Sequence, residues 1–319
     1  MPTEPILFEP LFMPRVWGGR RLEAWGKALP PGEVIGESWE LADREDAQSV
    51  VAVGPWAGRT LHDLWVTERQ TVFGTRGIAS RAPRFPLLVK LLDARATMSV
   101  QVHPPAAVAG ALGGEPKSEL WVVLEADAGA HLFLGLRGGV ARAELEERLQ
   151  AGGDVSELLH RVAIRAGDAA YVPSGRVHAI GAGCVIAEIQ QNSDTTYRVY
   201  DFDRPGLDGE PRELHVEASL RSIDFSDAEP ALLAPKATTL VDDEDVLVAA
   251  RLTLGDDPQP AAPAGECAVL CPLQEDLRLG TTTVPPGRFV LAPAAAALTM
   301  TGRGAVLRAL LPGPGMTAP

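Results

Sequence analysis

The 319-residue sequence predicts a mainly β protein. Its 32 glycines and 27 prolines favour many turns and short strands over long helices. Short apolar runs recur between turn residues, which is the pattern of buried strands. Several of these runs carry polar residues at every second position, so one face of each strand is polar. The length allows one large domain or two moderate ones.

The composition limits the partners and the compartment that we expect. The formal net charge of -13 argues against nucleic-acid binding, and an anionic substrate would need a local cationic pocket. Three cysteines, Cys184, Cys267 and Cys271, show no framework spacing and predict a reducing compartment with buried thiols. Glu4 and Glu9 interrupt any apolar leader, and no run of about 18 apolar residues occurs. We expect a cytoplasmic protein that binds neither nucleic acid nor membranes.

The first third of the chain predicts a helix followed by a buried strand. Residues 60–73 predict a short helix with Thr60 or Asp63 near its N-cap. Residues 85–93 are typical of a buried strand, and this strand carries Lys90. A lysine in such a setting either extends its ammonium to the surface or meets an anion.

Residues 96–103 form the next predicted strand, and their alternation is informative. Ser99, Gln101 and His103 lie on one face, with apolar residues on the other. An exposed antiparallel strand with one solvated face is the simple explanation. Serine, glutamine and histidine together are unusual for plain exposure, however, so we treat these three as candidate site residues.

The same alternation recurs at residues 115–124, where Lys117 and Glu119 share one face. An ordinary surface ion pair explains these two residues equally well, since exposed pairs are common and contribute little. A later apolar strand carries Glu188, again on a polar face. Arg198 follows in a dense polar stretch, where it could bind a phosphate in fork geometry.

The remaining segments predict the domain organisation. We expect a small helical insertion at about residues 141–160, divided by a Gly-Gly pair. Residues 226–239 have the composition of a linker. The predicted domains are therefore a catalytic domain at 1–235 and a smaller C-terminal β-domain at 236–319. The second domain is predicted to lack metal ligands, because no histidine lies beyond His215.

A turn, a short strand and a second turn precede His178. Gly167, Pro173, Gly175 and His178 show the spacing Gly-x5-Pro-x-Gly-x2-His. This resembles the second motif of the cupin superfamily, small β-barrels in which the histidine binds a metal. Taken alone, a core histidine bonded to a neighbouring carbonyl is the alternative explanation. The resemblance implies a cupin-type jelly-roll β-barrel.

Four of these residues supply two imidazoles, one carboxylate and one amide oxygen: Gln101, His103, Glu119 and His178. Such a set suits a divalent first-row metal such as zinc, with open positions for a substrate or water. Cations on the apolar strands of an acidic protein favour an anionic ligand. The residues that suit a phosphate are Ser99, Lys90, Lys117 and Arg198.

Seven segments, in this order, closely resemble type I mannose-6-phosphate isomerase (phosphomannose isomerase) in its short bacterial form. They are residues 17–19, 36–40, 90–93, 99–104, 117–121, 172–180 and 188–201. The resemblance implies one Zn2+ per chain and a sugar-phosphate substrate. The implied zinc ligands are Gln101, His103, Glu119 and His178; the implied substrate contacts are Ser99, Lys90 and Lys117; the implied catalytic groups are Arg198, Glu188 and Lys117.

The implied activity is reversible conversion of mannose 6-phosphate to fructose 6-phosphate through a cis-enediol. Zinc would polarise the sugar oxygens, and either Glu188 or Lys117 would move the proton between carbons 1 and 2. Pro116 stands where the family leads us to expect Gly, and it can reshape the turn before Lys117. Two alternatives stay open: a metal-dependent cupin oxygenase with a 2-His-1-carboxylate iron site, and a sugar-phosphate-binding cupin without turnover.

Overall fold

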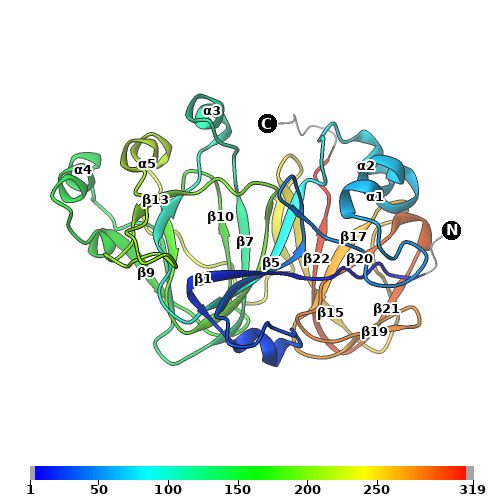
Figure 1. Ribbon diagram of the computed structural model, residues 1–319. Helices are drawn as coiled ribbons and strands as arrows, with labels where there is room; N and C mark the ends of the chain where they lie inside the picture. The colour runs from blue at the N-terminus through cyan, green and yellow to red at the C-terminus, as the bar shows by residue number, and fades with distance from the viewer. Residues whose placement is uncertain (1–3, 314–319) are drawn as a thin grey trace.

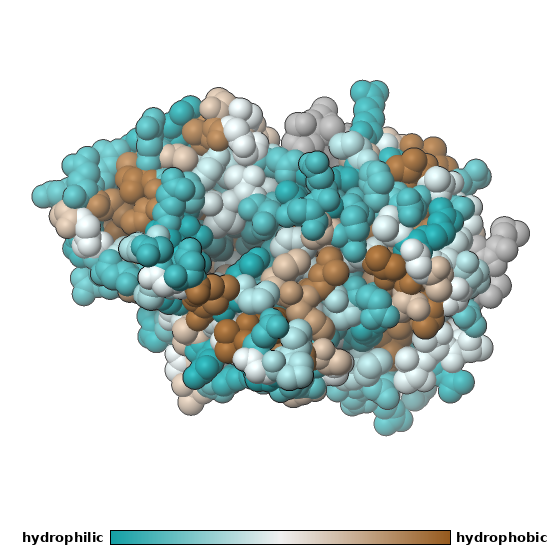
Figure 2. Space-filling model, in the orientation of Figure 1, coloured by the Kyte–Doolittle hydropathy of each residue, from teal (hydrophilic) through white to brown (hydrophobic). Residues whose placement is uncertain are grey.

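The computed structural model describes residues 4–313, and it shows two β regions side by side (Figure 1). Each region contains two antiparallel sheets, which confirms the prediction of a mainly β fold. On the face drawn in Figure 2, hydrophilic residues predominate and apolar residues gather in separate patches. Within residues 4–313, no helix has the length and apolarity needed to cross a membrane.

The first region consists of a six-stranded sheet that faces a five-stranded sheet. Sheet one contains, in spatial order, β1 (Leu11–Gly19), β2 (Ile35–Leu41), β5 (Leu87–Ala94), β12 (Cys184–Gln191), β7 (Glu119–Ala126) and β10 (Ala169–Val172). Sheet two contains β13 (Tyr197–Tyr200), β6 (Val100–Val102), β11 (His178–Ile180), β8 (His131–Leu136) and β9 (Leu159–Ala163). A two-stranded ribbon of β3 (Asp43–Arg44) and β4 (Ala47–Gln48) lies apart from both.

The second region repeats this arrangement with shorter strands. Sheet three contains β14 (Thr239–Asp243), β15 (Leu247–Leu254), β22 (Gly304–Leu310), β17 (Ala268–Pro272) and β20 (Val290–Ala292). Sheet four contains β16 (Gln259–Pro260), β21 (Thr299–Gly302), β18 (Leu277–Leu279) and β19 (Thr282–Val284). The predicted strands of the C-terminal part therefore exist, and several short strands join them.

Short helices connect these strands and cover their ends (Figure 1). The α-helices are α1 (Leu61–Thr67), α2 (Gly74–Ala79), α3 (Ala106–Ala109), α4 (Arg142–Gln150) and α5 (Val216–Ser222). The short 3-10 helices are η1 (Arg21–Trp25), η3 (Gly110–Leu112), η4 (Ser156–Leu158) and η5 (Ala294–Ala296). The segment η2 (Arg69–Phe73) is a short π-helix.

The predicted N-cap of the first helix is present. Thr60 Oγ1 accepts from the Asp63 backbone N–H at 3.0 Å, and Asp63 Oδ2 accepts from the Thr60 N–H at 3.2 Å. This reciprocal capping box satisfies two donors that the first turn of the helix leaves free. The helix therefore begins where the sequence predicted.

The predicted helical insertion at 141–160 is wrong in its second half. Helix α4 ends near Gly152, whose φ of +67° belongs to the left-handed region. Only the single turn η4 follows, and Leu159 then begins strand β9 and pairs with Leu136 of β8. The reason is non-local, because this segment completes the edge of sheet two instead of forming a second helix.

One continuous apolar cluster joins the two regions. Phe85 and Leu91 of the first region belong to the same cluster as Val269 and Leu307 of the second. The N-terminal segment adds a backbone connection, because Ile6 and Leu291 exchange hydrogen bonds of 2.8 and 3.0 Å. The two regions thus share a core, and the division into domains at residues 235 and 236 stays a prediction.

Candidate metal centre and active site

Strand register places three of the predicted residues in one row across sheet two. Gln101 of β6 is the direct Cα partner of His178 on β11 and of Arg198 on β13. Directly paired residues of neighbouring strands present their side chains on the same face of a sheet, about 5 Å apart. Arg198, Gln101 and His178 therefore lie side by side on one face.

A second row crosses sheet one. Lys90 of β5 pairs with Trp39 of β2 and with Glu188 of β12, and Glu188 pairs in turn with Trp121 of β7. Two positions further along β12, Gln190 lies opposite Glu119 of β7. Lys90, Glu188 and Glu119 are all buried, so the polar faces predicted from the alternation point into the molecule.

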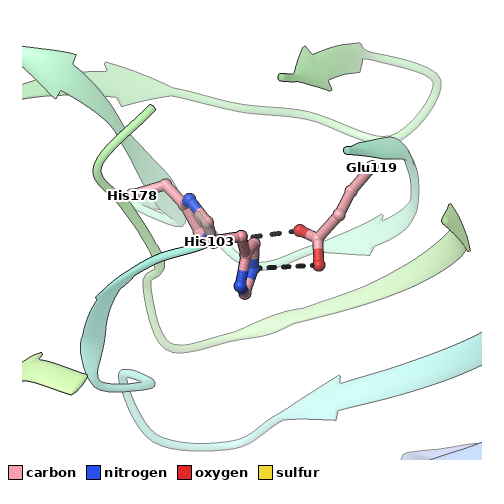
Figure 3. Close-up of side chains that lie close together, drawn as sticks. All are labelled: His103, Glu119 and His178. Atoms are coloured by element: carbon pink, nitrogen blue, oxygen red, sulfur yellow. Dashed lines mark ion pairs between the residues drawn. The ribbon is translucent and has the colours of Figure 1, made fainter. Parts of the chain in front are cut away.

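Three side chains meet between the two sheets (Figure 3). One ligand atom from each of His103, Glu119 and His178 lies within 4.8 Å of the others. His103 Nε2 is 3.2 Å from Glu119 Oε1, and His178 Nε2 is 3.8 Å from Glu119 Oε2. The amide nitrogen of Gln101 lies 3.2 Å from His178 Nε2, so the Gln101 side chain reaches the same centre.

The imidazoles are held in the form that binds a metal. His103 Nδ1 lies 2.8 Å from the Thr195 carbonyl, and His178 Nδ1 lies 2.8 Å from the Arg176 carbonyl. A carbonyl only accepts, so each Nδ1 donates and each Nε2 is an acceptor. Lys117 Nζ lies 3.5 Å from Nε2 of His103, and the Gln101 amide nitrogen lies 3.2 Å from Nε2 of His178. The explanation of His178 as a core histidine bonded to a carbonyl is thus half correct, because the other ring nitrogen faces the cluster.

The charges of the cluster agree with this arrangement. Burial lowers the pKa of His178 to about 3 and also lowers the pKa of His103, so both rings are neutral. Burial acts to raise the pKa of Glu119, but the Lys117 ammonium at 2.7 Å holds that pKa well below its ordinary value. Both Glu119 oxygens are buried and accept no well-directed hydrogen bond. Neutral imidazoles beside an ionised, unsatisfied carboxylate fit a divalent cation.

A chain of ion pairs lies beside this centre. Lys90 Nζ is 3.5 Å from Glu188 Oε1 and 3.6 Å from Glu37 Oε2, and its side chain is 4% exposed. Trp121 Nε1 donates to Glu188 Oε2 at 2.8 Å. Burial raises the pKa of Glu188 to about 7, and the nearby Glu119 charge adds to that shift. Of the two possibilities predicted for Lys90, the structure shows the second: its ammonium meets anions instead of extending to the surface. These anions are carboxylates of the protein itself.

A cavity of about 690 Å³ opens beside the row of sheet two. Ser99, Gln101 and Arg198 line it, as do Trp17 and Glu37. Arg198 donates to the Glu213 carbonyl at 2.7 Å, and its Nε is buried without a partner. The residues that line the cavity do not include Lys90, Lys117 or Glu188. The two ammoniums lie against carboxylates, and Glu188 accepts from a tryptophan.

Comparison with known proteins places the chain in a family. Residues 9–128 match the family described as phosphomannose isomerase type I, catalytic domain. Mannose-6-phosphate isomerase ManA of Bacillus subtilis is 42% identical over 229 residues, which cover 70% of this chain and 69% of that protein. The chain belongs to the type I phosphomannose isomerase family. A mannose-6-phosphate isomerase of Streptococcus mutans is 41% identical over 236 residues, covering 73% of this chain and 72% of that one.

The whole fold is shared with the phosphomannose isomerases. A crystal structure of the mannose 6-phosphate isomerase from Bacillus subtilis superposes with a TM-score of 0.81 at 29% identity, covering 96% of this chain and 99% of that chain. The family and the enzyme class predicted from the seven segments are thereby confirmed, together with the cupin-type fold. Pro116, the departure from the expected Gly, leaves Lys117 and Glu119 at the centre.

Sequence reasoning missed the role of Glu37 in this site. The signal was present, because residues 36–41 alternate as a strand and carry two carboxylates. All seven positions of β2 are buried, so Glu37 and Glu40 each require a buried partner. Their partners, Lys90 and Lys27, come from distant parts of the chain.

Proposed function

We propose that the protein interconverts mannose 6-phosphate and fructose 6-phosphate. The observation that carries this proposal is the buried group of His103, Glu119 and His178, with Nδ1 of each imidazole bound to a backbone carbonyl and Nε2 turned toward an ionised carboxylate, beside a cavity that Arg198 lines. Family membership supports the same reaction, because the Bacillus subtilis relative is a mannose-6-phosphate isomerase.

One zinc ion per chain would be held by Gln101, His103, Glu119 and His178. Two imidazoles with one carboxylate are a common donor set for catalytic zinc. When bound, zinc supplies a Lewis acid that stabilises negative charge on the sugar oxygens at carbons 1 and 2. The carbonyl groups of Thr195 and Arg176 orient the two imidazoles for that role.

Arg198 and Ser99 would bind the anionic end of the sugar phosphate in the cavity. The unpartnered Nε of Arg198 supports this, since a guanidinium donates to phosphate oxygens in a fork. The predicted phosphate contacts at Lys90 and Lys117 stay predictions. In the structure both ammoniums lie against carboxylates, where they balance buried negative charge.

Glu188 would carry the proton between carbons 2 and 1. A base works best when its pKa lies near the working pH, and the pKa of Glu188 is raised to about 7. The ionised carboxylate would take the proton from carbon 2 and return it to carbon 1. Between these two steps the hydroxyl proton moves from the oxygen on carbon 2 to the oxygen on carbon 1, so that the intermediate is the cis-enediol or its enediolate. Lys117, 2.7 Å from Glu119, is the second candidate for this proton transfer.

Metal content and isomerase activity measured on one preparation test the proposal. Purified protein is analysed for bound metal and then assayed for fructose 6-phosphate formation, before and after chelation. We expect activity to disappear on chelation and to return with zinc. Metal binding without exchange of the carbon-2 proton would instead indicate a sugar-phosphate-binding protein. Oxygen consumption with ferrous iron would indicate an oxygenase.

A further inference from the structure

The ion pairs beside the metal centre form a linear series from the cavity rim to Glu188. Arg15 Nε donates to Glu37 Oε1 at 2.8 Å. Glu37 Oε2 is 3.6 Å from Lys90 Nζ, which is 3.5 Å from Glu188 Oε1. Arg15 and Glu37 line the cavity, whereas Lys90 and Glu188 are not among its lining residues. One buried ammonium is thus shared between two buried carboxylates.

We propose that Glu37 is a positioning residue that acts through Lys90: by sharing the Lys90 ammonium, it prevents an exclusive Lys90–Glu188 ion pair and leaves the Glu188 carboxylate available as a base. This inference rests on the proposed function, in which Glu188 moves the substrate proton. Glu37 itself takes no part in the proton transfer. Its contribution is a fixed negative charge on the far side of Lys90.

The surroundings of Glu37 keep it ionised. Trp39 Nε1 donates to Glu37 Oε2 at 2.6 Å, and Arg15 donates to the other oxygen. Burial acts to raise the pKa of Glu37, but Lys90 and Arg15 overcome it and lower the pKa to about 2. Glu37 therefore carries its full charge throughout the range in which the enzyme would work.

Lys90 is equally fixed in place and in charge. Its ammonium lies 5.1 Å from the centre of the Trp39 ring, a cation–π arrangement. Burial acts to lower the pKa of Lys90, but the Glu37 and Glu188 carboxylates raise it above the ordinary value. Because the position and the charge of Lys90 are both held, a change at Glu37 reaches Glu188 as electrostatic potential.

The direction of the effect follows from the charges that face Glu188. Glu119 and Glu37 raise its pKa, and Lys90 and Lys117 lower it. Removing the charge of Glu37 leaves Lys90 to Glu188 alone, so Glu188 would lose its proton at lower pH. A Glu188 carboxylate held ionised by an uncompensated Lys90 is a weaker base.

Glu40 provides a matched control on the same strand. It is a buried carboxylate that pairs with a buried lysine, Lys27, at 2.7 Å and accepts from Ser38 Oγ at 2.6 Å. Its position, three residues after Glu37, places it on the opposite face of β2, where Lys27 also donates to the Gly287 carbonyl. Glu40→Gln therefore breaks a similar ion pair at a distance from Glu188.

The experiment compares the metal-loaded wild type with Glu37→Gln and Glu40→Gln. Two readouts are recorded against pH: kcat/KM, and the carboxyl carbon signal of Glu188 in a 13C-labelled sample, assigned with Glu188→Gln. For Glu37→Gln we expect both midpoints to fall by about 1.5 pH units, the shift expected for one charge at this range with an effective dielectric of about 20. For Glu40→Gln we expect unchanged midpoints.

A reduced kcat with an unchanged Glu188 midpoint in Glu37→Gln would overturn the inference and leave Glu37 a structural residue. Arg15→Met is a second variant in case Glu37→Gln does not fold, since the Arg15 side chain is 33% exposed. The Arg15→Met substitution removes a cation that offsets the Glu37 charge. The pH midpoint of Glu188 should therefore rise by about a few tenths of a pH unit. A fall or no change would contradict the proposal.

The two readouts separate failure of the inference from failure of the proposed function. If the wild type lacks isomerase activity, the carboxyl signal of Glu188 still reports whether Glu37 controls its ionisation. If activity is present and its pH midpoint does not follow the Glu188 signal, Glu188 is not the proton carrier. In that case Glu37 tunes a group that the reaction does not use.

Discussion

The two β regions have the same architecture, but the interior of the first contains charged side chains and that of the second is apolar. Each contains a pair of antiparallel sheets. Between the sheets of the first region lie Lys90, Glu119 and Glu188 with the two metal-site histidines. Between those of the second lies an apolar cluster that includes Leu254, Leu270, Met300 and Val306. Among the described residues after Ser222, no charged side chain is buried.

This difference shows where the protein accepts a cost in stability. Burying charged groups is unfavourable unless they are paired, and the first region pairs Lys90 with two carboxylates and Lys117 with Glu119. The second region has the apolar interior that stabilises a fold most simply. Because one apolar cluster joins both regions, the second can stabilise the strands that hold the site.

The largest expected effect comes from removing the carboxylate at the metal centre. Glu119→Gln should release the metal and lower kcat by more than about 10³-fold, because a Lewis acid contributes several kcal/mol to such a step. Metal analysis and the isomerase assay on one preparation measure both losses. Glu266→Gln, a partly buried carboxylate of the second region, is the control and should change neither. Full activity of Glu119→Gln would show that the centre is not built as proposed.

A core substitution in the second region should lower the stability of the protein and leave its activity unchanged. Leu270 is fully buried on β17, so Leu270→Ala should lower the free energy of unfolding by about 2–5 kcal/mol. The kcat per folded molecule should stay unchanged, because the apolar cluster around Leu270 lies outside the site. Urea denaturation and an assay below the transition measure the two quantities. A fall in kcat would mean that the second region also shapes the active site.

The cavity can be tested through Arg198, whose Nε has no hydrogen-bond partner. Arg198→Ala should lower kcat/KM by about 10²-fold, because a charged donor to the substrate is lost. The affinity for inorganic phosphate, measured by calorimetry, should weaken in parallel. Arg303→Ala is the control in the second region, where this exposed arginine should leave both values unchanged. Wild-type kinetics with zinc bound would remove Arg198 from the site.

The smallest expected effect is a pH dependence confined to the first region. Glu188, with its pKa raised to about 7, acts as a base only when ionised, so kcat/KM should fall about tenfold per unit below that pH. In Glu188→Gln, the fall of kcat/KM on the acidic side of the pH profile should be absent. A raised folded pKa also favours the neutral form, so the stability that this group contributes is lost as pH rises through about 7. Leu270→Ala should shift the stability curve without altering that dependence.

Much of the site could be predicted from local patterns. Period-two alternation placed Ser99, Gln101 and His103 on one polar face, and the structure places the first two at the cavity and the third in the candidate metal centre. The Thr60 cap was also readable, because capping involves residues only three positions apart. Only the second half of the helical insertion was predicted wrongly, because residues 159–163 pair with β8, a contact between distant residues that no local pattern contains.

The sequence by itself determined the chemistry of this protein: the imidazoles, carboxylates and cations at strand positions, and the ordered segments that place it in its family. Tertiary structure alone decided which of these groups meet. The pairing of β5 with both β2 and β12 puts Lys90 between Glu37 and Glu188. The packing of sheet one on sheet two brings Glu119 to the histidines. Side-chain identity is a local property, whereas strand register and burial are set by the packing of the whole chain.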